Sequence, residues 1–227
     1  QYGKESTAIG DEGGFAPALS KSKEALDLLV EATKQCGYSD EIGFALDAAA
    51  SDFYDTETKK YQIEKDLHLD YKELTQYYNE LLKEYPLISI EDPMAEDDFE
   101  GFMYFMANSL EPKEKNIFSN KKKVLVVGDD LLVTNPKRIL EAQKEKLCNS
   151  LLLKINQIGT LTEAIQAHKL AESSGWHTIV SHRSGETPDD FIADLAYALE
   201  SSIKLGAPAR GERVAKYNRL LELYHNN

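Results

Sequence analysis

The feature that most constrains the fold is a repeated pattern in which a short apolar run ends on a side chain capable of chemistry. In residues 151–154, three leucines are followed directly by Lys154. An apolar run of strand length that ends in a charge indicates a buried strand carrying that charge to its end. Comparable runs end at five further residues: Asp47, Glu91, Asp129, His182 and Lys204.

Amphipathic helical patterns separate these runs, which indicates βαβ units and a parallel sheet. Helices are expected over about 22–35, 71–84, 97–106, 135–146, 160–175, 187–199 and 212–224. Pro188 is expected in the first turn of the helix that starts at Thr187. Apolar spacing predicts that the last helix packs through Val214, Tyr217, Leu220 and Leu221.

Two segments fall outside this alternation. Residues 48–70 are polar and aromatic, and we expect an excursion or a hairpin there. Residues 108–123 contain Pro112 and many lysines, which indicates a surface loop. A basic docking patch is the less favoured alternative for this loop, because a solvated loop explains it without a partner.

The distribution of polar groups favours a barrel over a doubly wound sheet. Doubly wound sheets concentrate their chemistry at one switch point. Here every strand carries a polar group at its carboxyl end, as in a (β/α) barrel whose active face is built from all the strands. Six strands are visible in the sequence, fewer than a closed barrel of this type contains. We therefore predict an α/β fold: one incomplete TIM-type barrel domain over residues 1–227, with about six βα units.

Composition excludes several classes of function. A formal charge of −13 argues against a nucleic-acid-binding surface. No apolar run reaches the roughly 18 residues of a membrane span. Cys36 and Cys148 show neither metal-site spacing nor a disulfide framework, which favours a reducing compartment. The first residues show neither a signal peptide nor an initiator methionine, so we expect the chain to begin inside a larger protein.

Three of the strand-end groups are carboxylates: Asp47, Glu91 and Asp129. Taken alone, any one of them is more simply a helix cap or the partner of a lysine. Three on successive strands, opposite two lysines and a histidine, favour a site for Mg²⁺. A lysine beside Mg²⁺ suits abstraction of a proton α to a carboxylate, because the metal stabilises the resulting dianion.

Several segments resemble motifs of the enolase (phosphopyruvate hydratase) family, in the family's order. They are residues 10–17, 89–93, 128–136, 151–160, 181–187 and 206–210. The resemblance covers nearly the whole chain and implies the C-terminal barrel portion of an enolase. It implies a Mg²⁺-dependent lyase of glycolysis and gluconeogenesis, cytoplasmic, that interconverts 2-phosphoglycerate and phosphoenolpyruvate plus water.

The resemblance also implies residue roles. Lys154 would remove the C2 proton, and Glu12 would assist departure of the C3 hydroxide. The implied ligands of the first magnesium are Asp47, Glu91 and Asp129. His182 is an implied substrate contact, Arg183 and Ser184 are implied contacts on the phosphate side, and Lys204 is implied to hold the carboxylate of the substrate. A planar guanidinium suits phosphate, and an ammonium suits a carboxylate as a point charge.

Parts of the family pattern have no counterpart in this sequence: the N-terminal α+β domain, the first barrel strands, another acidic catalytic residue and the loop that completes a second magnesium site. We therefore expect the chain alone to be inactive or nearly so, because an incomplete barrel cannot close over substrate. The resemblance implies a homodimer for the full-length protein and a small phosphorylated carboxylate as its substrate.

Two alternatives remain open. One is another member of the superfamily acting on a different carboxylate, although Arg183 in the segment 181–187 argues for a phosphate. The other is non-catalytic use of the scaffold as a binding or structural protein.

Overall fold

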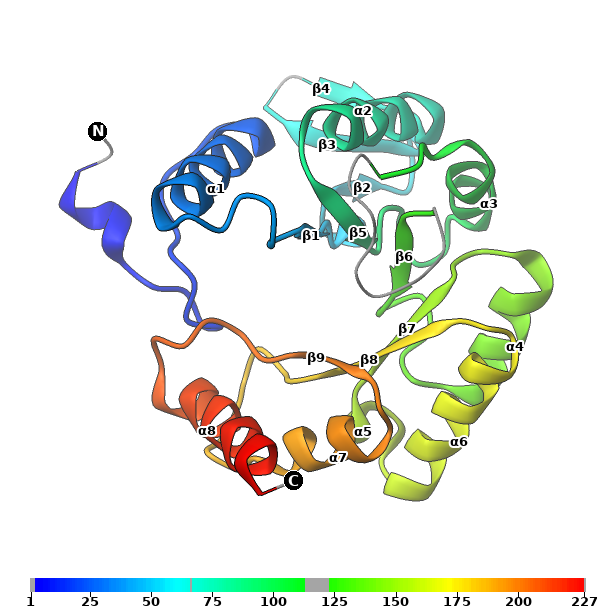
Figure 1. Ribbon diagram of the computed structural model, residues 1–227. Coiled ribbons are helices and arrows are strands. Elements are labelled where there is room, and N and C mark those ends of the chain that lie inside the picture. The colour runs from blue at the N-terminus through cyan, green and yellow to red at the C-terminus, as the bar shows by residue number, and fades with distance from the viewer. Residues whose placement is uncertain (1–2, 66, 113–122, 227) are drawn as a thin grey trace.

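The core of the fold is a six-stranded parallel sheet in the order β1-β5-β6-β7-β8-β9. The computed structural model describes residues 3–65, 67–112 and 123–226. The strands are β1 (Phe44–Asp47), β5 (Leu87–Glu91), β6 (Leu125–Gly128), β7 (Ser150–Leu153), β8 (His177–Ser181) and β9 (Ser202–Lys204). Figure 1 shows the sheet curving into part of a ring, with helices around its outside. The α/β fold is a half-barrel consistent with an incomplete TIM barrel, as predicted.

The helices form the outer layer of the half-barrel. They are α1 (Ser22–Cys36), α2 (Tyr71–Glu84), α3 (Phe99–Asn108), α4 (Pro136–Glu145), α5 (Ile155–Ile158), α6 (Leu161–Ser173), α7 (Phe191–Ala198) and α8 (Gly211–His225). Short 3-10 turns lie at η1 (Lys4–Thr7) and η2 (Ala50–Phe53). Among the described residues, no helix combines the length and apolar character needed to span a bilayer.

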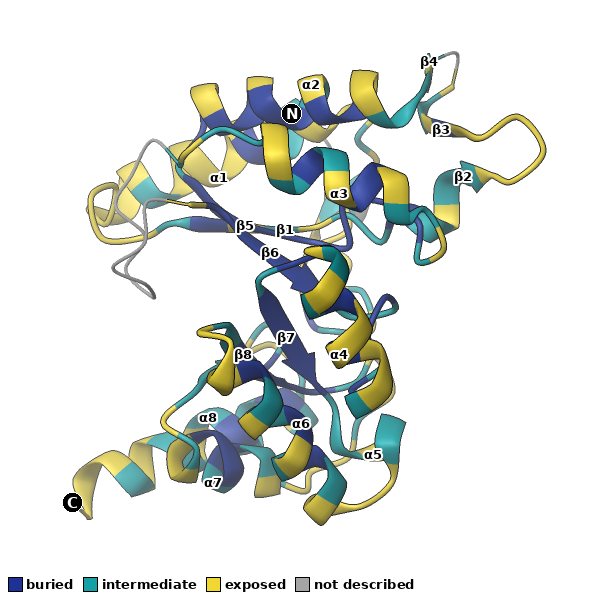
Figure 2. Cartoon of the chain, turned by 90° about the vertical axis from the view of Figure 1, so that its right-hand side faces the viewer, coloured by how far each residue is buried: buried dark blue, intermediate teal, exposed yellow. Residues whose placement is uncertain are grey.

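The strands are apolar because both of their faces are covered, which is typical of parallel sheets. The main core lies between the sheet and the helices and includes Val126, Leu151 and Leu153. A smaller cluster on the inner face joins Leu125, Val127 and Leu152. Neighbouring residues of one strand thus point to opposite faces. Figure 2 shows the strands buried while the outer surfaces of the helices are exposed.

Local signals set the helix ends that the sequence predicts. Gly37 ends α1 in the left-handed conformation, with φ of 79°. Asp70 begins α2 by accepting hydrogen bonds from the backbone N–H groups of Lys72 and Glu73. Asn135 caps α4 ahead of Pro136 in the same way. The expected boundaries of these helices are confirmed to within a residue or two.

The predicted start of the helix at Thr187 is wrong, because α7 begins at Phe191. The carbonyl oxygen of Thr187 accepts a hydrogen bond from the buried Lys216 ammonium and is not free for a helix. The side chain of Asp189 then accepts from the backbone N–H of Phe191 and closes a local turn. A tertiary contact therefore overrides the helix start predicted from Thr187 and Pro188.

The predicted packing face of the last helix is also wrong in part. Leu221 is 58% exposed. The fully buried side chains of α8 are instead two cations, Arg213 and Lys216. Their charges are directed toward loops at the carboxyl ends of the strands, where carbonyl oxygens accept their hydrogen bonds.

The expected excursion after β1 is confirmed as a three-stranded antiparallel sheet. It consists of β2 (Tyr54–Asp55), β3 (Lys60–Glu64) and β4 (Leu67–Leu69). Buried Tyr61 anchors it by donating to Asp98 and accepting from the backbone N–H of Ala95. The surface loop expected over 108–123 falls largely outside the described residues.

Truncation of a core side chain on the outer layer tests this packing. Leu82 of α2 is 1% exposed, so Leu82→Ala leaves a cavity and should cost about 2–5 kcal/mol of unfolding free energy. Leu221→Ala, on the exposed side of α8, should change it by no more than about 0.5 kcal/mol. Urea unfolding followed by circular dichroism measures both, and equal losses would contradict the burial described here.

Candidate active site

Each strand of the half-barrel delivers a candidate group at its carboxyl end. Asp47 and Glu91 are the last residues of β1 and β5 and lie opposite each other in register. Lys204 ends β9 and pairs with Ser181 of β8. The other three groups directly follow β6, β7 and β8: Asp129, Lys154 and His182. Because all the strands are parallel, these side chains meet at one rim of the half-barrel.

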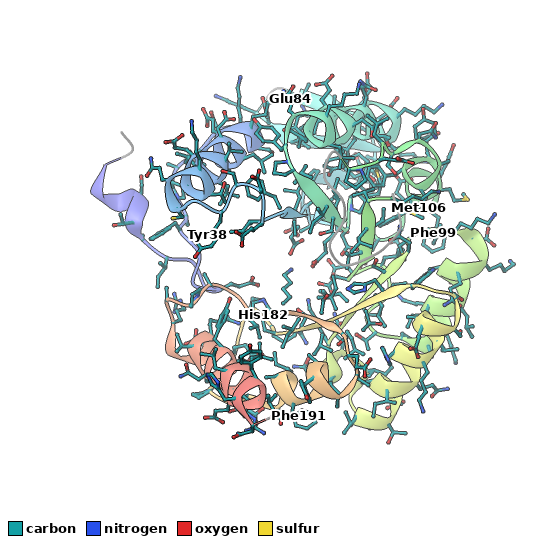
Figure 3. The ribbon with its side chains drawn as sticks, viewed as in Figure 1. Tyr38, Glu84, Phe99, Met106, His182 and Phe191 are labelled. Atoms are coloured by element: carbon teal, nitrogen blue, oxygen red, sulfur yellow. The ribbon has the colours of Figure 1, made fainter. Side chains whose placement is uncertain are left out.

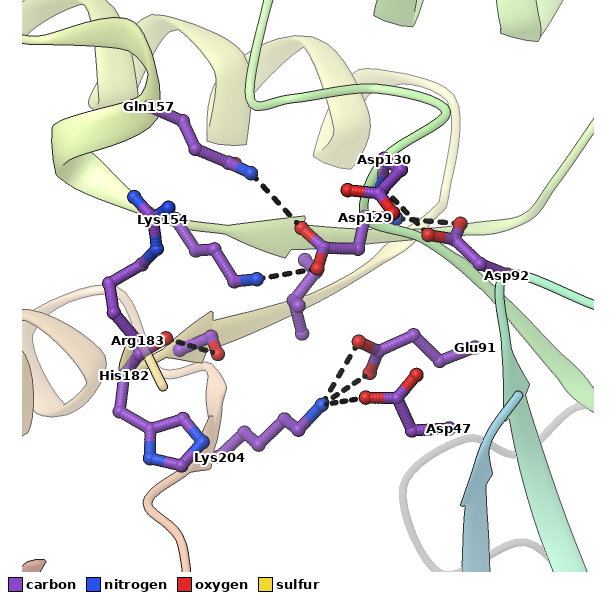
Figure 4. Close-up of polar contacts among 12 residues, drawn as sticks. Asp47, Glu91, Asp92, Asp129, Asp130, Lys154, Gln157, His182, Arg183 and Lys204 are labelled. Atoms are coloured by element: carbon purple, nitrogen blue, oxygen red, sulfur yellow. Dashed lines mark hydrogen bonds and ion pairs between the residues drawn. The ribbon is translucent and has the colours of Figure 1, made fainter. Parts of the chain in front are cut away.

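The ammonium of Lys204 joins two of the predicted metal ligands. Its Nζ lies 2.7 Å from Asp47 Oδ2 and 2.9 Å and 3.1 Å from the two carboxylate oxygens of Glu91 (Figure 4). Burial favours the neutral amine, but the charges of Glu91 and Asp47 outweigh it and raise the pKa of Lys204. Lys204 therefore remains a cation and neutralises part of this acidic cluster.

Lys154 and Asp129 form a second ion pair on the same rim. Lys154 Nζ lies 2.5 Å from Asp129 Oδ2, and both side chains are largely buried. Gln157 donates to the other oxygen of Asp129 at 3.2 Å, and Gln157 is itself held by Thr134. The short helix α5 follows Lys154 directly, so it fixes both groups around Asp129.

Asp92 and Asp130 lie beside Asp129, although neither is one of the predicted ligands. Among the described residues, Asp92, Asp129 and Asp130 offer ligand oxygens within 4.8 Å of one another. Asp92 already accepts the backbone N–H groups of Asp129 and Asp130, and its own φ is 39°. Burial, together with the charges of Asp129 and Asp130, raises the pKa of Asp92 to about 7 against those hydrogen bonds. Asp92 thus stabilises the turn that presents Asp129.

The chemistry of the predicted donor set fits a divalent cation. Asp47, Glu91 and Asp129 project from three adjacent strands, and all their donors are hard carboxylate oxygens. Burial raises the pKa of Glu91, and so does the charge of Asp47, although Lys204 opposes both. A further cation nearby stabilises a carboxylate anion that is destabilised in this way. The three residues therefore remain the predicted Mg²⁺ ligands.

His182 and Glu12 lie next to each other at the mouth of the half-barrel, the open space at the carboxyl ends of its strands. The imidazole is 2% exposed, and its Nε2 lies 3.3 Å from Glu12 Oε2. Figure 3 shows His182 on the inner side of the ring, whereas Phe191 lies among the outer helices. Glu12 comes from the loop before α1, which reaches the segment after β9: its carbonyl oxygen accepts from the backbone N–H of Ala207.

The two predicted phosphate contacts lie just beyond His182. Arg183 Nη1 donates to Asn156 Oδ1 at 2.7 Å, so its guanidinium leans toward the end of β7. Ser184, the next residue in the chain, is exposed. The loop 183–187 is held by Glu186, which accepts from the backbone N–H of Arg183 and forms an ion pair with Lys216.

Several residues of the site escaped sequence reasoning. Arg213 and Lys216 lie in a helical pattern in which charged residues normally face solvent. Gln157 and Asp92 lie inside the segments 151–160 and 89–93, which the sequence singles out without assigning them a role. Their closeness in the chain to two predicted site residues was the available signal, because Gln157 follows Lys154 by three positions and Asp92 directly follows Glu91.

Protonation of Glu186 tests the loop anchor. Burial opposes ionisation, but the hydrogen bonds from Lys216 and two backbone N–H groups outweigh it and lower the pKa of Glu186 below 4.5. A lowered folded-state pKa adds stability that is present above about pH 4.5 and is lost as pH falls through the folded pKa.

Glu186→Gln should therefore cost about 1–3 kcal/mol near neutral pH, and less as the pH falls. Urea unfolding at pH values from about 7 down to about 3 measures this change. Glu141→Gln, at an exposed position of α4, is the matched control and should follow the parent. A cost for Glu186→Gln that stays constant with pH would contradict the ion pair.

Comparison with known proteins agrees with this geometry. The family model described as "Enolase, C-terminal TIM barrel domain" matches residues 1–226. A protein named enolase from Methanocaldococcus jannaschii is 51% identical over 98% of this chain, which corresponds to 49% of that relative. An enolase from Methanococcus aeolicus is 50% identical over 98% of this chain and 50% of its own length.

The chain spans about half the length of the curated relatives that it matches. The match extends across every strand and helix of the half-barrel, and across each residue assigned to the rim. The chain therefore belongs to the family of enolase C-terminal TIM barrel domains.

Proposed function

We propose that this chain is the partial barrel domain of an enolase, which interconverts 2-phosphoglycerate and phosphoenolpyruvate plus water. The observation that carries the proposal is the alternation of charge on one rim. Lys204 bridges Asp47 and Glu91, while Lys154 contacts Asp129. A cationic Lys204 and the amine of Lys154, set among three carboxylates, suit a substrate that is itself anionic and must lose a proton, which Lys154 can accept only in its neutral form.

Lys154 is the proposed base for the C2 proton. Its amine projects from the end of β7 into the mouth and is held by a carboxylate that is also a proposed metal ligand. Glu12 is the proposed acid, because its carboxyl group enters the mouth from a different loop, beside His182. A base and an acid on opposite segments can act on neighbouring carbons of one small substrate.

The proposed substrate contacts divide by charge. Lys204 offers a fixed point charge for the carboxylate of the substrate, while Arg183 offers a planar fork for the phosphate, with the Ser184 hydroxyl beside it. The buried His182 is the remaining proposed contact to the substrate. Bound Mg²⁺, held by Asp47, Glu91 and Asp129, would supply the Lewis acid that stabilises the negative charge of the deprotonated substrate.

We also propose that catalysis requires the half of the relatives that this chain does not span. A sheet that is open between β9 and β1 leaves the mouth unenclosed, so water is not excluded. The homodimer and the cytoplasmic location belong to the proposal too, and the family resemblance supports them.

A chimera tests the proposed activity. In it, this chain replaces the matching half of the Methanocaldococcus jannaschii relative, and formation of phosphoenolpyruvate from 2-phosphoglycerate is followed by absorbance with Mg²⁺ present. We expect turnover by the chimera and none by this chain alone. Lys154→Ala in the chimera should lower kcat by on the order of 10²–10⁴-fold, whereas Lys137→Ala on the exposed side of α4 should not.

Full activity of the Lys154→Ala chimera would remove this lysine from the role of base. Turnover of another carboxylate but not of 2-phosphoglycerate would instead support a different activity of the superfamily. Measurable turnover by this chain alone would contradict the requirement for the other half.

Metal binding tests the proposed ligands without relying on turnover. Isothermal titration calorimetry of the chimera with Mg²⁺ should give binding that Asp47→Asn, Glu91→Gln and Asp129→Asn each weaken by more than about tenfold. Asp97→Asn, an exposed acid, is the control and should bind as the parent does. Unchanged affinity in all three variants would place the metal away from these residues, whereas loss in Asp129→Asn alone would favour the cluster of Asp92, Asp129 and Asp130.

A further inference from the structure

A fully buried guanidinium lies directly behind the mouth. Arg213, in the first turn of α8, is 0% exposed. Its two terminal nitrogens make four hydrogen bonds, each 2.7–2.9 Å long. The acceptors are His182 Nδ1 and the carbonyl oxygens of Asp11, Arg183 and Ser184. One side chain thus ties the loop that carries Glu12 to the loop that follows β8.

The contact between Arg213 and His182 decides where the imidazole proton lies. A guanidinium offers N–H donors only and keeps its charge at all ordinary pH values. Nη1 of Arg213 lies 2.7 Å from His182 Nδ1, so Nδ1 must accept with its lone pair. The neutral ring then carries its proton on Nε2. A doubly protonated ring would set two N–H groups against each other at this distance.

The environment of the ring agrees with a neutral imidazole. Burial lowers the pKa of His182, and the charges of Arg213 and Lys204 lower it further, while Glu12 opposes them. Within the described part of the chain, Nε2 has no hydrogen-bond partner, although Glu12 Oε2 is 3.3 Å away. The proton on Nε2 therefore lies near Glu12 without being bonded to it, and it is available to a further acceptor.

Close packing prevents the ring and the guanidinium from separating. Gly206, with φ of +77°, lies against both of them. A Cβ atom at Gly206 would lie 3.0 Å from Arg213 Cδ, 3.0 Å from His182 Cε1 and 2.6 Å from the carbonyl oxygen of Glu12. Only a residue without a side chain fits here, so Gly206 allows the three groups to approach one another closely.

We infer that Arg213 is a positioning residue that fixes His182 as a neutral imidazole, with its proton on Nε2, close to Glu12 at the mouth. The tautomer follows from the contacts alone. Its consequence rests on the proposed function: His182 donates a hydrogen bond to a substrate oxygen placed beside Nε2 and Glu12, and it cannot act there as a base.

Nitrogen-15 NMR of the histidine rings in the uniformly labelled 227-residue chain tests the tautomer directly. Loss of a ring signal in His182→Gln assigns His182. We expect a pyridine-like Nδ1 and a pyrrole-like Nε2 in the unsubstituted chain near neutral pH. A pyrrole-like Nδ1, or two protonated nitrogens, would overturn the inference whatever the substituted chains do.

Substitution of the guanidinium tests its role. Arg213→Met removes every donor and should let His182 populate the other tautomer or the imidazolium, whereas Arg213→Lys keeps one charged donor and should retain part of the Nε2–H signal. Arg219→Met on the same helix removes an arginine paired with Asp194 and should leave the spectrum unchanged. An unaltered His182 signal in a folded Arg213→Met chain would overturn the positioning role.

The catalytic consequence is measured separately in the chimera. Arg213→Met should lower kcat by about 10–100-fold, as expected when a contact to substrate loses its orientation. Its Mg²⁺ affinity should stay at the parent value, because Arg213 contacts none of the proposed ligands. A parent chimera without turnover would defeat the proposed function and leave the NMR result standing. An active parent with an unimpaired Arg213→Met variant would defeat the link between tautomer and substrate.

Discussion

The site depends on a balance of charge that the parallel sheet makes necessary. Parallel strands bring their carboxyl ends to one rim, and three of those ends carry carboxylates. Carboxylates that lie close together in a partly buried environment repel one another strongly. Lys204, which bridges Asp47 and Glu91, and Lys154, which pairs with Asp129, relieve that repulsion. Either lysine is therefore a stabilising counter-ion in the structure as well as a candidate participant in the proposed chemistry.

A second set of cations operates one layer behind the rim. Arg213 and Lys216 are buried in α8, and both donate to backbone carbonyl oxygens of the loop after β8. Isolated buried charges are costly unless every donor is satisfied. Here the carbonyl oxygens, together with Glu186, accept most of those hydrogen bonds. The same hydrogen bonds hold the backbone of the loop after β8 in place. The candidate substrate loop is thus stabilised from the helix layer rather than by its own turns.

Much of the fold could be predicted because its signals are local. Apolar runs with a charge at their end predicted all six barrel strands, and capping residues such as Asp70 and Asn135 predicted helix ends. The strand-end groups of the candidate site follow from the same pattern. A magnesium site and a lysine base were inferred from the residues, whereas the substrate and the contact assigned to each side chain came from the family resemblance; all of these assignments remain predictions.

The sequence by itself determined the parallel half-barrel and which side chains stand at its rim, because strand length, burial and position at a strand end are properties of short segments. Only the tertiary structure decided how those side chains are paired and held. Arg213 approaches His182 across 31 residues of chain, and Asp11 across 202. Helical periodicity predicts that charged residues such as Arg213 and Lys216 face solvent. They are buried because carbonyl oxygens from distant loops accept their hydrogen bonds, and no local sequence pattern reveals those contacts.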